Sequence, residues 1–158
     1  MNTRALGKNG PQVPVICFGA WPIGGAMGAL PQEQAIASVQ TAIDIGMTFI
    51  DTAASYRNSE ALIGKAIQGR RHQVFLATKL SGDDHSGKKI DESINNSLRA
   101  LGTDYIDLYQ LHSPQPQWPI EDTMKNLLRL LEDGKIRYLG ISNFSAEQTK
   151  EALNYGPV

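Results

Sequence analysis

The chain has 158 residues, a formal net charge of -1 and one cysteine, Cys17. This length suits a single domain with a sizeable core, and the near-neutral charge excludes the electrostatic footprint of a protein that binds nucleic acid or anionic membranes. The lone cysteine excludes an internal disulfide and favours the cytoplasm. Residues 1–10 lack the apolar core of a signal peptide, and no apolar stretch approaches the length of a membrane span.

Residues 1–15 are predicted to form a short β-hairpin. The segments 3–6 and 13–15 flank the sequence Gly7-Lys8-Asn9-Gly10. Its Asn-Gly pair favours the positive φ angles of a tight turn, so the turn is expected there.

From residue 15 onward, short apolar runs alternate with segments of helical periodicity, at roughly one unit every 30 residues. Such alternation predicts a parallel sheet covered by helices. The expected strands are residues 15–19, 48–52, 74–79, 105–112 and 138–142.

The expected helices have recognisable start and stop signals. Pro31 suits a first helical turn, and Gly46 suits a left-handed helix end. Ser59 is expected to cap a helix that runs to Gly69. Further helices are expected from about residue 90 to Gly102, from Pro119 to Gly134, and from a capping box of Ser145 and Gln148 to the Gly156-Pro157 exit.

Two architectures fit this alternation, namely a doubly wound open sheet and a (β/α)8 barrel, which needs about 250 residues. The polar residues at the strand ends favour the barrel. We therefore predict an α/β fold in which residues 1–158 form a single domain, an incomplete TIM (β/α)8 barrel of about five βα units. Residues 1–15 form the hairpin and residues 15–158 the five units.

Polar residues end four successive expected strands, where parallel α/β folds place their chemistry. Taken singly, each of these side chains has an ordinary structural explanation. Asp51 could cap a loop, and Lys79 could extend into solvent. His112 could be a hydrogen-bonded core histidine, and Tyr56 could be an aromatic that packs in the core. Their convergence on one rim favours a functional site. The set comprises Asp51, Lys79, His112 and Ser142-Asn143 at strand ends, with Tyr56 five residues beyond Asp51.

The chemistry that needs these side chains is proton delivery to a carbonyl oxygen. A free tyrosine, with a pKa near 10, is a weak acid at neutral pH, and a nearby ammonium favours its phenolate. Lys79 supplies that ammonium, and Asp51 its counter-ion. His112 is suited to hold the substrate oxygen near Tyr56. No nucleophile–base pair is present, so a Ser-His-Asp hydrolase is a poor fit.

Other cofactor motifs are missing from the sequence. Residues 24–28 are glycine-rich but lack the G-x-G-x-x-G spacing of a dinucleotide-binding fold, and there is no P-loop. The three histidines are dispersed, so no metal site is predicted. Cys17 is expected to fill the core within a buried strand.

Five segments carry a resemblance to the aldo-keto reductase family. They occur in family order, with family-like spacing, and cover essentially the whole chain. They are residues 18–21 (Phe-Gly-Ala-Trp), 49–53 (Phe-Ile-Asp-Thr-Ala) with Tyr56 following, 77–79 (Ala-Thr-Lys), 105–112 (Tyr-Ile-Asp-Leu-Tyr-Gln-Leu-His) and 134–144 (Gly-Lys-Ile-Arg-Tyr-Leu-Gly-Ile-Ser-Asn-Phe).

The resemblance implies reduction of aldehydes or ketones by hydride transfer from NADPH, without metal. Tyr56 would donate the proton, Lys79 and Asp51 would tune it, and His112 would orient the carbonyl. Ser142 and Asn143 would hold the nicotinamide carboxamide, with Trp21 and Asp51 also at the cofactor. The short loops resemble the bacterial and potassium-channel β-subunit branches of the family.

The sequence ends where the family's sixth strand would begin, so a truncated barrel is expected, with its first and fifth strands as open edges. Phe49, Phe75, Leu108 and Ile141 should then be partly uncovered. Self-association through these edges is one expected consequence. The alternatives to a reductase are a redox-inactive binding or regulatory module of the same fold and, less favoured, a phosphate-binding isomerase barrel.

Overall fold

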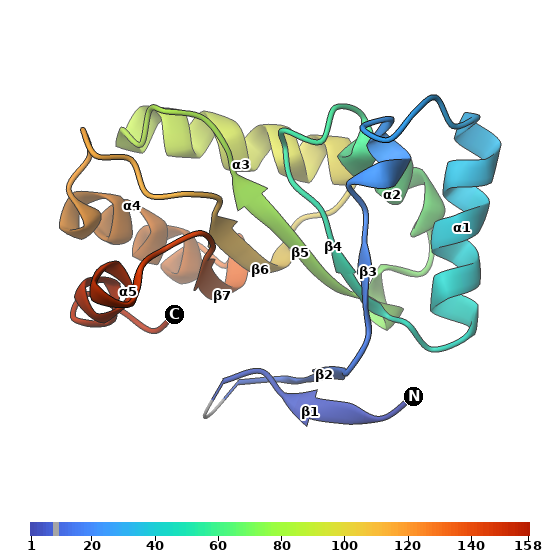
Figure 1. Ribbon diagram of the computed structural model, residues 1–158, viewed down its shortest axis with the longest axis horizontal. Coiled ribbons are helices and arrows are strands. Elements are labelled where there is room, and N and C mark those ends of the chain that lie inside the picture. The colour runs from blue at the N-terminus through green and yellow to red at the C-terminus, as the bar shows by residue number, and fades with distance from the viewer. Residues whose placement is uncertain (8–9) are drawn as a thin grey trace.

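An antiparallel hairpin begins the chain. In the computed structural model, which describes residues 1–7 and 10–158, β1 (Thr3–Ala5) pairs with β2 (Gln12–Pro14), as predicted (Figure 1). The predicted Asn-Gly turn includes Lys8 and Asn9, which lie outside the described residues. Val15 donates its backbone N–H to the backbone oxygen of Asn2. The hairpin lies at the end of the sheet where the parallel strands begin (Figure 1).

Five parallel strands form one sheet, and their order in space is their order along the chain. A doubly wound sheet reverses its strand order at a switch point, whereas a barrel adds each strand beside the last. The sheet is therefore part of a (β/α)8 barrel, as predicted, and β3 and β7 are its edges within the described residues. The strands are β3 (Cys17–Gly19), β4 (Phe49–Asp51), β5 (Phe75–Leu80), β6 (Ile106–Leu111) and β7 (Ile136–Ile141).

The helices pack along one face of this sheet (Figure 1). Across residues 1–7 and 10–158, none of them combines the length and apolar character needed to cross a membrane. They are α1 (Gln32–Asp44), α2 (Ser59–Ala66), α3 (Gly87–Leu101), α4 (Ile120–Glu132) and α5 (Ala146–Leu153), with short 3-10 helices η1 (Pro22–Gly24) and η2 (Arg71–Gln73).

Most of the predicted helix signals are confirmed. Gly46 and Gly102 adopt φ angles of 86° and 63° at helix ends, and Ser145 and Gln148 form both hydrogen bonds of the capping box. The Ser59 prediction is wrong, because Asn58 precedes the helix and Ser59 is its first residue. The Ser59 hydroxyl instead bonds the backbone of Ala20 and the hydroxyl of Thr52, at 3.0 and 2.9 Å, which ties α2 to the two loops beneath it.

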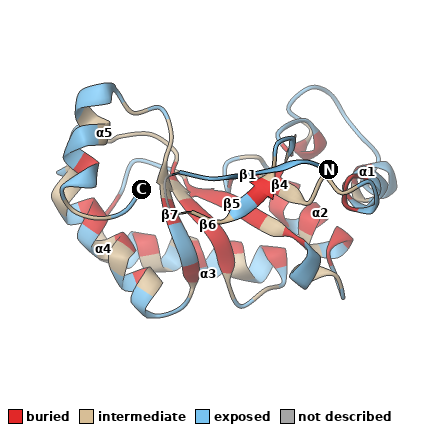
Figure 2. Cartoon of the chain, turned by 90° about the horizontal axis from the view of Figure 1, so that it is seen from below, coloured by how far each residue is buried: buried red, intermediate tan, exposed pale blue. Residues whose placement is uncertain are grey.

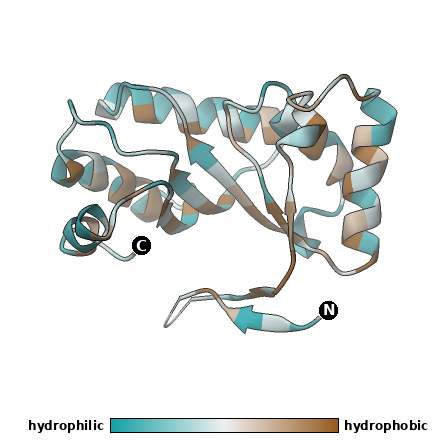
Figure 3. Cartoon of the chain, viewed as in Figure 1, coloured by the Kyte–Doolittle hydropathy of each residue, from teal (hydrophilic) through white to brown (hydrophobic). Residues whose placement is uncertain are grey.

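The core lies between the sheet and its helices, where buried residues gather (Figure 2) and apolar strand positions meet the apolar sides of the helices (Figure 3). Side chains alternate between the two faces of each strand. Ile50, Leu76 and Tyr109 point toward the helices and are fully buried.

The opposite, concave face of the sheet is more open. Phe49 and Phe75 are only half-buried there, as expected, whereas Leu108 is buried, with 8% of its surface exposed. Ile141 is also half-buried, but it is in register with Leu111 and therefore lies on the side that faces the helices. The prediction for Cys17 is wrong, because this residue is exposed. Cys17 is in register with Phe49 and therefore lies on the same, concave face of the sheet, on an edge strand. The helices cover only the opposite face (Figure 1).

Candidate active site

Side chains from β4, β5 and β6 meet at the carboxyl ends of these strands. Asp51 is in register with Ala77, and Lys79 is in register with Gln110. Because positions two apart on a strand share a face, Asp51, Lys79 and Gln110 all project from the concave face. The parallel register therefore brings together groups that are far apart in the sequence.

Lys79 is a buried cation with two oxygen partners. Its Nζ lies 2.5 Å from Oδ1 of Asp51 and 2.8 Å from the backbone oxygen of Thr52. Only 6% of the lysine surface is exposed. An unpaired charge in such a place costs several kcal/mol, on the order of a full protein's stability margin. Asp51 thus supplies the opposite charge that offsets the cost of burying Lys79.

The aromatic rings of Tyr56 and His112 close the site above this ion pair. The Nζ of Lys79 lies 5.1 Å from the centroid of the Tyr56 ring. The Tyr56 and His112 rings meet edge to face, with centroids 5.8 Å apart and an interplanar angle of 78°. The structure therefore brings all four predicted residues into one cluster.

The loop that carries Tyr56 is held by backbone contacts. Tyr56 donates its N–H to the oxygen of Ala53, and its own oxygen accepts from the N–H of Ser59, at 2.9 and 3.0 Å. Gly24 lies against this loop so closely that a Cβ there would sit 2.2 Å from the Tyr56 oxygen. In the sequence, Gly24 stands out only as part of a glycine-rich loop. No pattern in the sequence links it to Tyr56, since the two meet only through the tertiary fold.

His112 is held at both its backbone and its ring. Its N–H donates to the oxygen of Leu80 at 3.1 Å, and Nδ1 of the ring lies 3.0 Å from Oγ of Ser81 and 3.4 Å from Oγ of Ser55. Burial, and then the positive charge of Lys79, lower the pKa of the imidazole below its usual value, with Asp51 opposing them. The neutral imidazole, with one donor and one acceptor nitrogen, is the favoured form at neutral pH.

Gln110 is a member of the site that the sequence analysis missed. Its Nε2 donates to Oδ2 of Asp51 at 2.9 Å. Gly140 on the next strand makes room for it, because a Cβ there would lie 2.9 Å from Cγ of Gln110. Strand alternation was the sequence signal that could have revealed Gln110. Because Gln110 is two residues before His112, the alternation places it on the concave face beside Lys79.

Besides Asp51, the other three residues expected at the cofactor, Trp21, Ser142 and Asn143, lie at the same rim. Asn143, in a left-handed conformation with φ 61°, donates from Nδ2 to the backbone oxygen of His112 and to Oγ of Ser142, at 2.8 and 3.0 Å. Its amide hydrogens are thereby engaged, which leaves Oδ1 as an acceptor. Trp21 follows β3 and is 50% exposed. A hydroxyl beside an amide oxygen provides one hydrogen-bond donor and one acceptor, which is the combination that a carboxamide needs.

No metal centre accompanies these groups. Within residues 1–7 and 10–158, no three His, Cys, Asp or Glu side chains gather closely enough to hold a metal ion.

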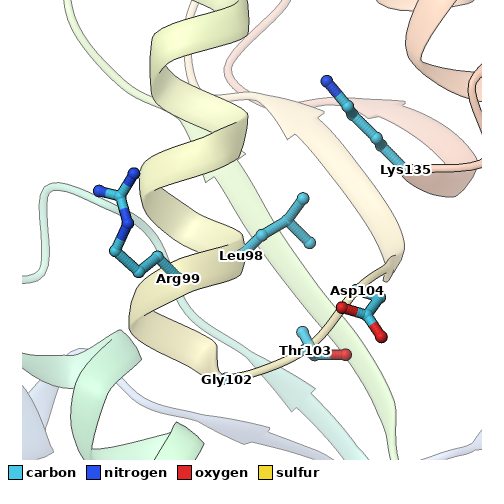
Figure 4. A pocket seen from close by; sticks show the side chains of 6 residues that line it. All are labelled: Leu98, Arg99, Gly102, Thr103, Asp104 and Lys135. Carbon is cyan, nitrogen blue, oxygen red and sulfur yellow. The ribbon is translucent and has the colours of Figure 1, made fainter.

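Two hollows lie elsewhere on the surface. The smaller, of about 430 Å³, is at the amino ends of β6 and β7, the edge of the sheet opposite the ion pair (Figure 4). It is lined by Leu98, Arg99, Gly102, Thr103, Asp104 and Lys135. A groove of about 800 Å³ runs between the hairpin and β7 and reaches Gln110, but not Tyr56 or His112. Neither hollow contains the cluster of four residues.

Comparisons with known proteins identify relatives along almost the whole chain. The sequence model of the Aldo/keto reductase family matches residues 15–158. Aldo-keto reductase YhdN of Bacillus subtilis is 43% identical over 161 aligned residues, which cover 94% of this chain and 49% of that protein. L-galactose dehydrogenase of Arabidopsis thaliana is 34% identical over 88% of the chain. The chain spans about half the length of the curated relatives it matches.

Solved structures with the same fold include two reductases from bacteria. The holo form of a Bacillus halodurans aldo-keto reductase superposes with a TM-score of 0.91 at 34% identity, covering 100% of this chain and 55% of that one. A Klebsiella pneumoniae aldo-keto reductase in complex with NADPH gives a TM-score of 0.85 at 34% identity, covering 99% and 55% of the two chains. These likenesses agree with five units of an eight-unit barrel.

Proposed function

Because the chain belongs to the aldo/keto reductase family, we propose that it forms the proton-transfer part of an NADPH-dependent carbonyl reductase. Its substrates would be aldehydes or ketones, and its products alcohols. The observation that supports this most directly is the placement of Lys79 between the carboxylate of Asp51 and the ring of Tyr56. That arrangement suits a phenol that gives up a proton.

Tyr56 is the proposed proton donor. NADPH, when bound, supplies the hydride that reduces the carbonyl carbon. The Tyr56 hydroxyl gives its proton to the carbonyl oxygen, and the phenolate that remains takes a proton from solvent. An ammonium close to the ring favours that phenolate, and Lys79 lies 5.1 Å from the ring centroid. Asp51 pairs with Lys79, and Gln110 holds Asp51 from the other side.

His112 is the proposed orienting residue. Its ring stands edge-on to Tyr56, so a carbonyl oxygen that accepts a hydrogen bond from the imidazole lies beside the phenol. Holding the acceptor in line with the donor lowers the entropy cost of proton transfer. The backbone contacts of His112 keep the ring in this place.

The proposed cofactor contacts are at Trp21, Asp51, Ser142 and Asn143. Oδ1 of Asn143 and the hydroxyl of Ser142 provide the acceptor and donor that a carboxamide needs, and the exposed ring of Trp21 offers an apolar surface at the same rim. The solved Klebsiella pneumoniae relative is a complex with NADPH, which supports NADPH as the ligand for this part of the fold.

The test is replacement of Tyr56 by phenylalanine in the full chain. Tyr56→Phe is expected to lower NADPH-dependent aldehyde reduction by about 100-fold or more, the usual contribution of a positioned acid. NADPH affinity, followed by quenching of tryptophan fluorescence with Trp21→Phe to assign the signal, is expected to change less than about twofold. Tyr105→Phe is the matched control, because its ring lies between Arg71 and Arg137.

Two results would contradict the proposal. Unchanged reduction by Tyr56→Phe would exclude Tyr56 as the proton donor. A wild-type chain that binds NADPH but reduces no carbonyl would instead be a redox-inactive nucleotide-binding module of this fold.

A further inference from the structure

Two serine hydroxyls converge on one nitrogen of His112. Ser81 follows β5 and Ser55 lies in the loop after β4, yet their Oγ atoms lie 3.0 and 3.4 Å from Nδ1 of the ring. The two hydroxyls are also 3.2 Å apart. Their positions come from different strands, so this arrangement is a product of the fold.

A neutral imidazole carries its hydrogen on one nitrogen, and the partner of the other nitrogen decides which. Histidines in functional sites commonly donate the hydrogen on Nδ1 to a carboxylate or a backbone carbonyl. Both of these groups can accept a hydrogen bond but cannot donate one. Such a partner would leave Nε2 without a hydrogen. A hydroxyl differs, because it can donate as well as accept.

The proposed function requires the opposite tautomer. A substrate carbonyl oxygen only accepts, so the nitrogen that faces it must carry the hydrogen. Nδ1 is occupied by the two serines, which leaves Nε2 as the nitrogen available to the substrate. An Nε2 lone pair would repel the carbonyl oxygen.

We propose that Ser81 and Ser55 are positioning residues that set the tautomer of His112, by donating a hydroxyl hydrogen to Nδ1 so that Nε2 keeps its own. Ser81 is half-buried and Ser55 is exposed. When Ser81 donates to Ser55, the Ser55 hydroxyl is the one that reaches Nδ1. When Ser81 turns to Nδ1, Ser55 bonds water instead. This inference rests on the proposed role of His112.

The surroundings of the ring favour a neutral form in which the tautomer matters. Burial, and then the charge of Lys79, act against a charged imidazole. Asp51 opposes them, but it is engaged by Lys79 and Gln110 and does not hydrogen-bond the ring. The backbone of His112 is held by Leu80 and Asn143, and its ring packs edge to face against Tyr56 with Nδ1 toward the serines.

The decisive measurement is 15N NMR of the ring nitrogens in the full chain, because protonated and unprotonated nitrogens differ widely in chemical shift. The chain has three histidines, so His112→Gln assigns the relevant signals. The wild type is expected to show hydrogen on Nε2 near pH 8. Ser81→Ala with Ser55→Ala is expected to give a mixture of tautomers. Ser81→Thr, which keeps a hydroxyl, should restore the Nε2 form in the Ser55→Ala background.

Each result decides the proposal. Hydrogen on Nδ1 in the wild type overturns it, and so does an unchanged tautomer in the double variant. If the double variant does not fold, the single variants Ser81→Ala and Ser55→Ala are measured in its place. Ser113→Ala is the control, since this neighbouring hydroxyl accepts a hydrogen bond from Gln115, and none of the hydrogen bonds to the His112 ring among the described residues comes from it.

Kinetics separates this proposal from the proposed function. In an active chain, the double variant is expected to lower kcat/KM for the carbonyl by about tenfold, with NADPH affinity unchanged and Ser81→Thr near wild type. If the wild-type chain reduces no carbonyl, the proposed function fails. The NMR result would still show whether the serines set the tautomer.

Discussion

Gln110 and Asp51 are joined across the sheet by a 2.9 Å hydrogen bond from Nε2 to Oδ2. Lys79 holds the other carboxylate oxygen, Oδ1, at 2.5 Å. The carboxylate is therefore fixed at both oxygens, by a cation on β5 and an amide on β6. Because the amide is neutral, it restrains the rotation of Asp51 without competing for the charge of Lys79.

Replacing Gln110 by leucine should weaken the site without disturbing the fold. Gln110→Leu keeps the size of the side chain but removes the donor, and a hydrogen bond to a charged group contributes about 1.5–3 kcal/mol. We expect carbonyl reduction to fall by about tenfold or more. Steady-state kinetics checks this, with Gln40→Leu on the exposed side of α1 as control. Equal loss in both variants would contradict a specific role for Gln110.

Adding a methyl group at Gly24 should displace the Tyr56 loop. A Cβ there would lie 2.2 Å from the Tyr56 backbone oxygen, so Gly24→Ala forces the loop to move. We expect a loss of about 1–3 kcal/mol in the free energy of unfolding, typical of overpacking, together with reduced activity. Gly19→Ala is the control, because a Cβ at that position meets no atom within 4 Å. A wild-type melting temperature for Gly24→Ala would contradict the prediction.

Cys17 should report on the charges of the ion pair. Although Cys17 is exposed as a residue, its thiol is partly surrounded by protein atoms. This partial burial, and then the charge of Asp51, raise the pKa of the thiol to about 11, whereas Lys79 acts to lower it. Asp51→Asn is therefore expected to lower the thiol pKa and Lys79→Met to raise it. The pH dependence of alkylation by iodoacetamide measures this at a single site, because Cys17 is the chain's one cysteine.

The control for the Cys17 alkylation measurement is Asp44→Asn. The carboxylate of Asp44 pairs with Arg70 on the side of the sheet that carries the helices. It should leave the alkylation profile unchanged. Shifts of the same sign in the Asp51 and Lys79 variants would contradict the electrostatic interpretation.

Glu60 should make the stability of the chain depend on pH. This carboxyl is buried and accepts a hydrogen bond from Thr78 at 2.7 Å. Burial raises its pKa above the ordinary value, and the hydrogen bonds only partly offset this. The folded chain then binds the proton more tightly than the unfolded chain. At pH values above the pKa of Glu60 in the folded chain, the ionised carboxyl therefore lowers the free energy of unfolding. This loss disappears as the pH falls toward the pKa that Glu60 has in the unfolded chain.

Glu60→Gln is accordingly expected to raise the melting temperature near pH 8 and to change it little near pH 4. Its carbonyl can still accept from Thr78, so packing is kept. Glu151→Gln, at an exposed position of α5, is the control. A stabilisation by Glu60→Gln that is the same at both pH values would show that packing, and not charge, is responsible.

The sequence alone was enough to predict the βα alternation, the order of the elements and most helix ends. Each of these follows from a periodicity or a cap within one short segment, such as the capping box of Ser145 and Gln148. It also identified Asp51, Tyr56, Lys79 and His112, because strand ends in a parallel sheet share one rim, and the family resemblance assigned them roles.

Which other side chains contact these four residues depends on the tertiary structure. The bond from Gln110 to Asp51, the contact of Gly24 with the Tyr56 loop and the approach of Ser81 and Ser55 to His112 all join residues from different elements. Such contacts depend on strand register and on the path of loops, which no local pattern encodes. Cys17 shows the same limit, because an apolar run predicts a strand but not whether both of its faces are covered.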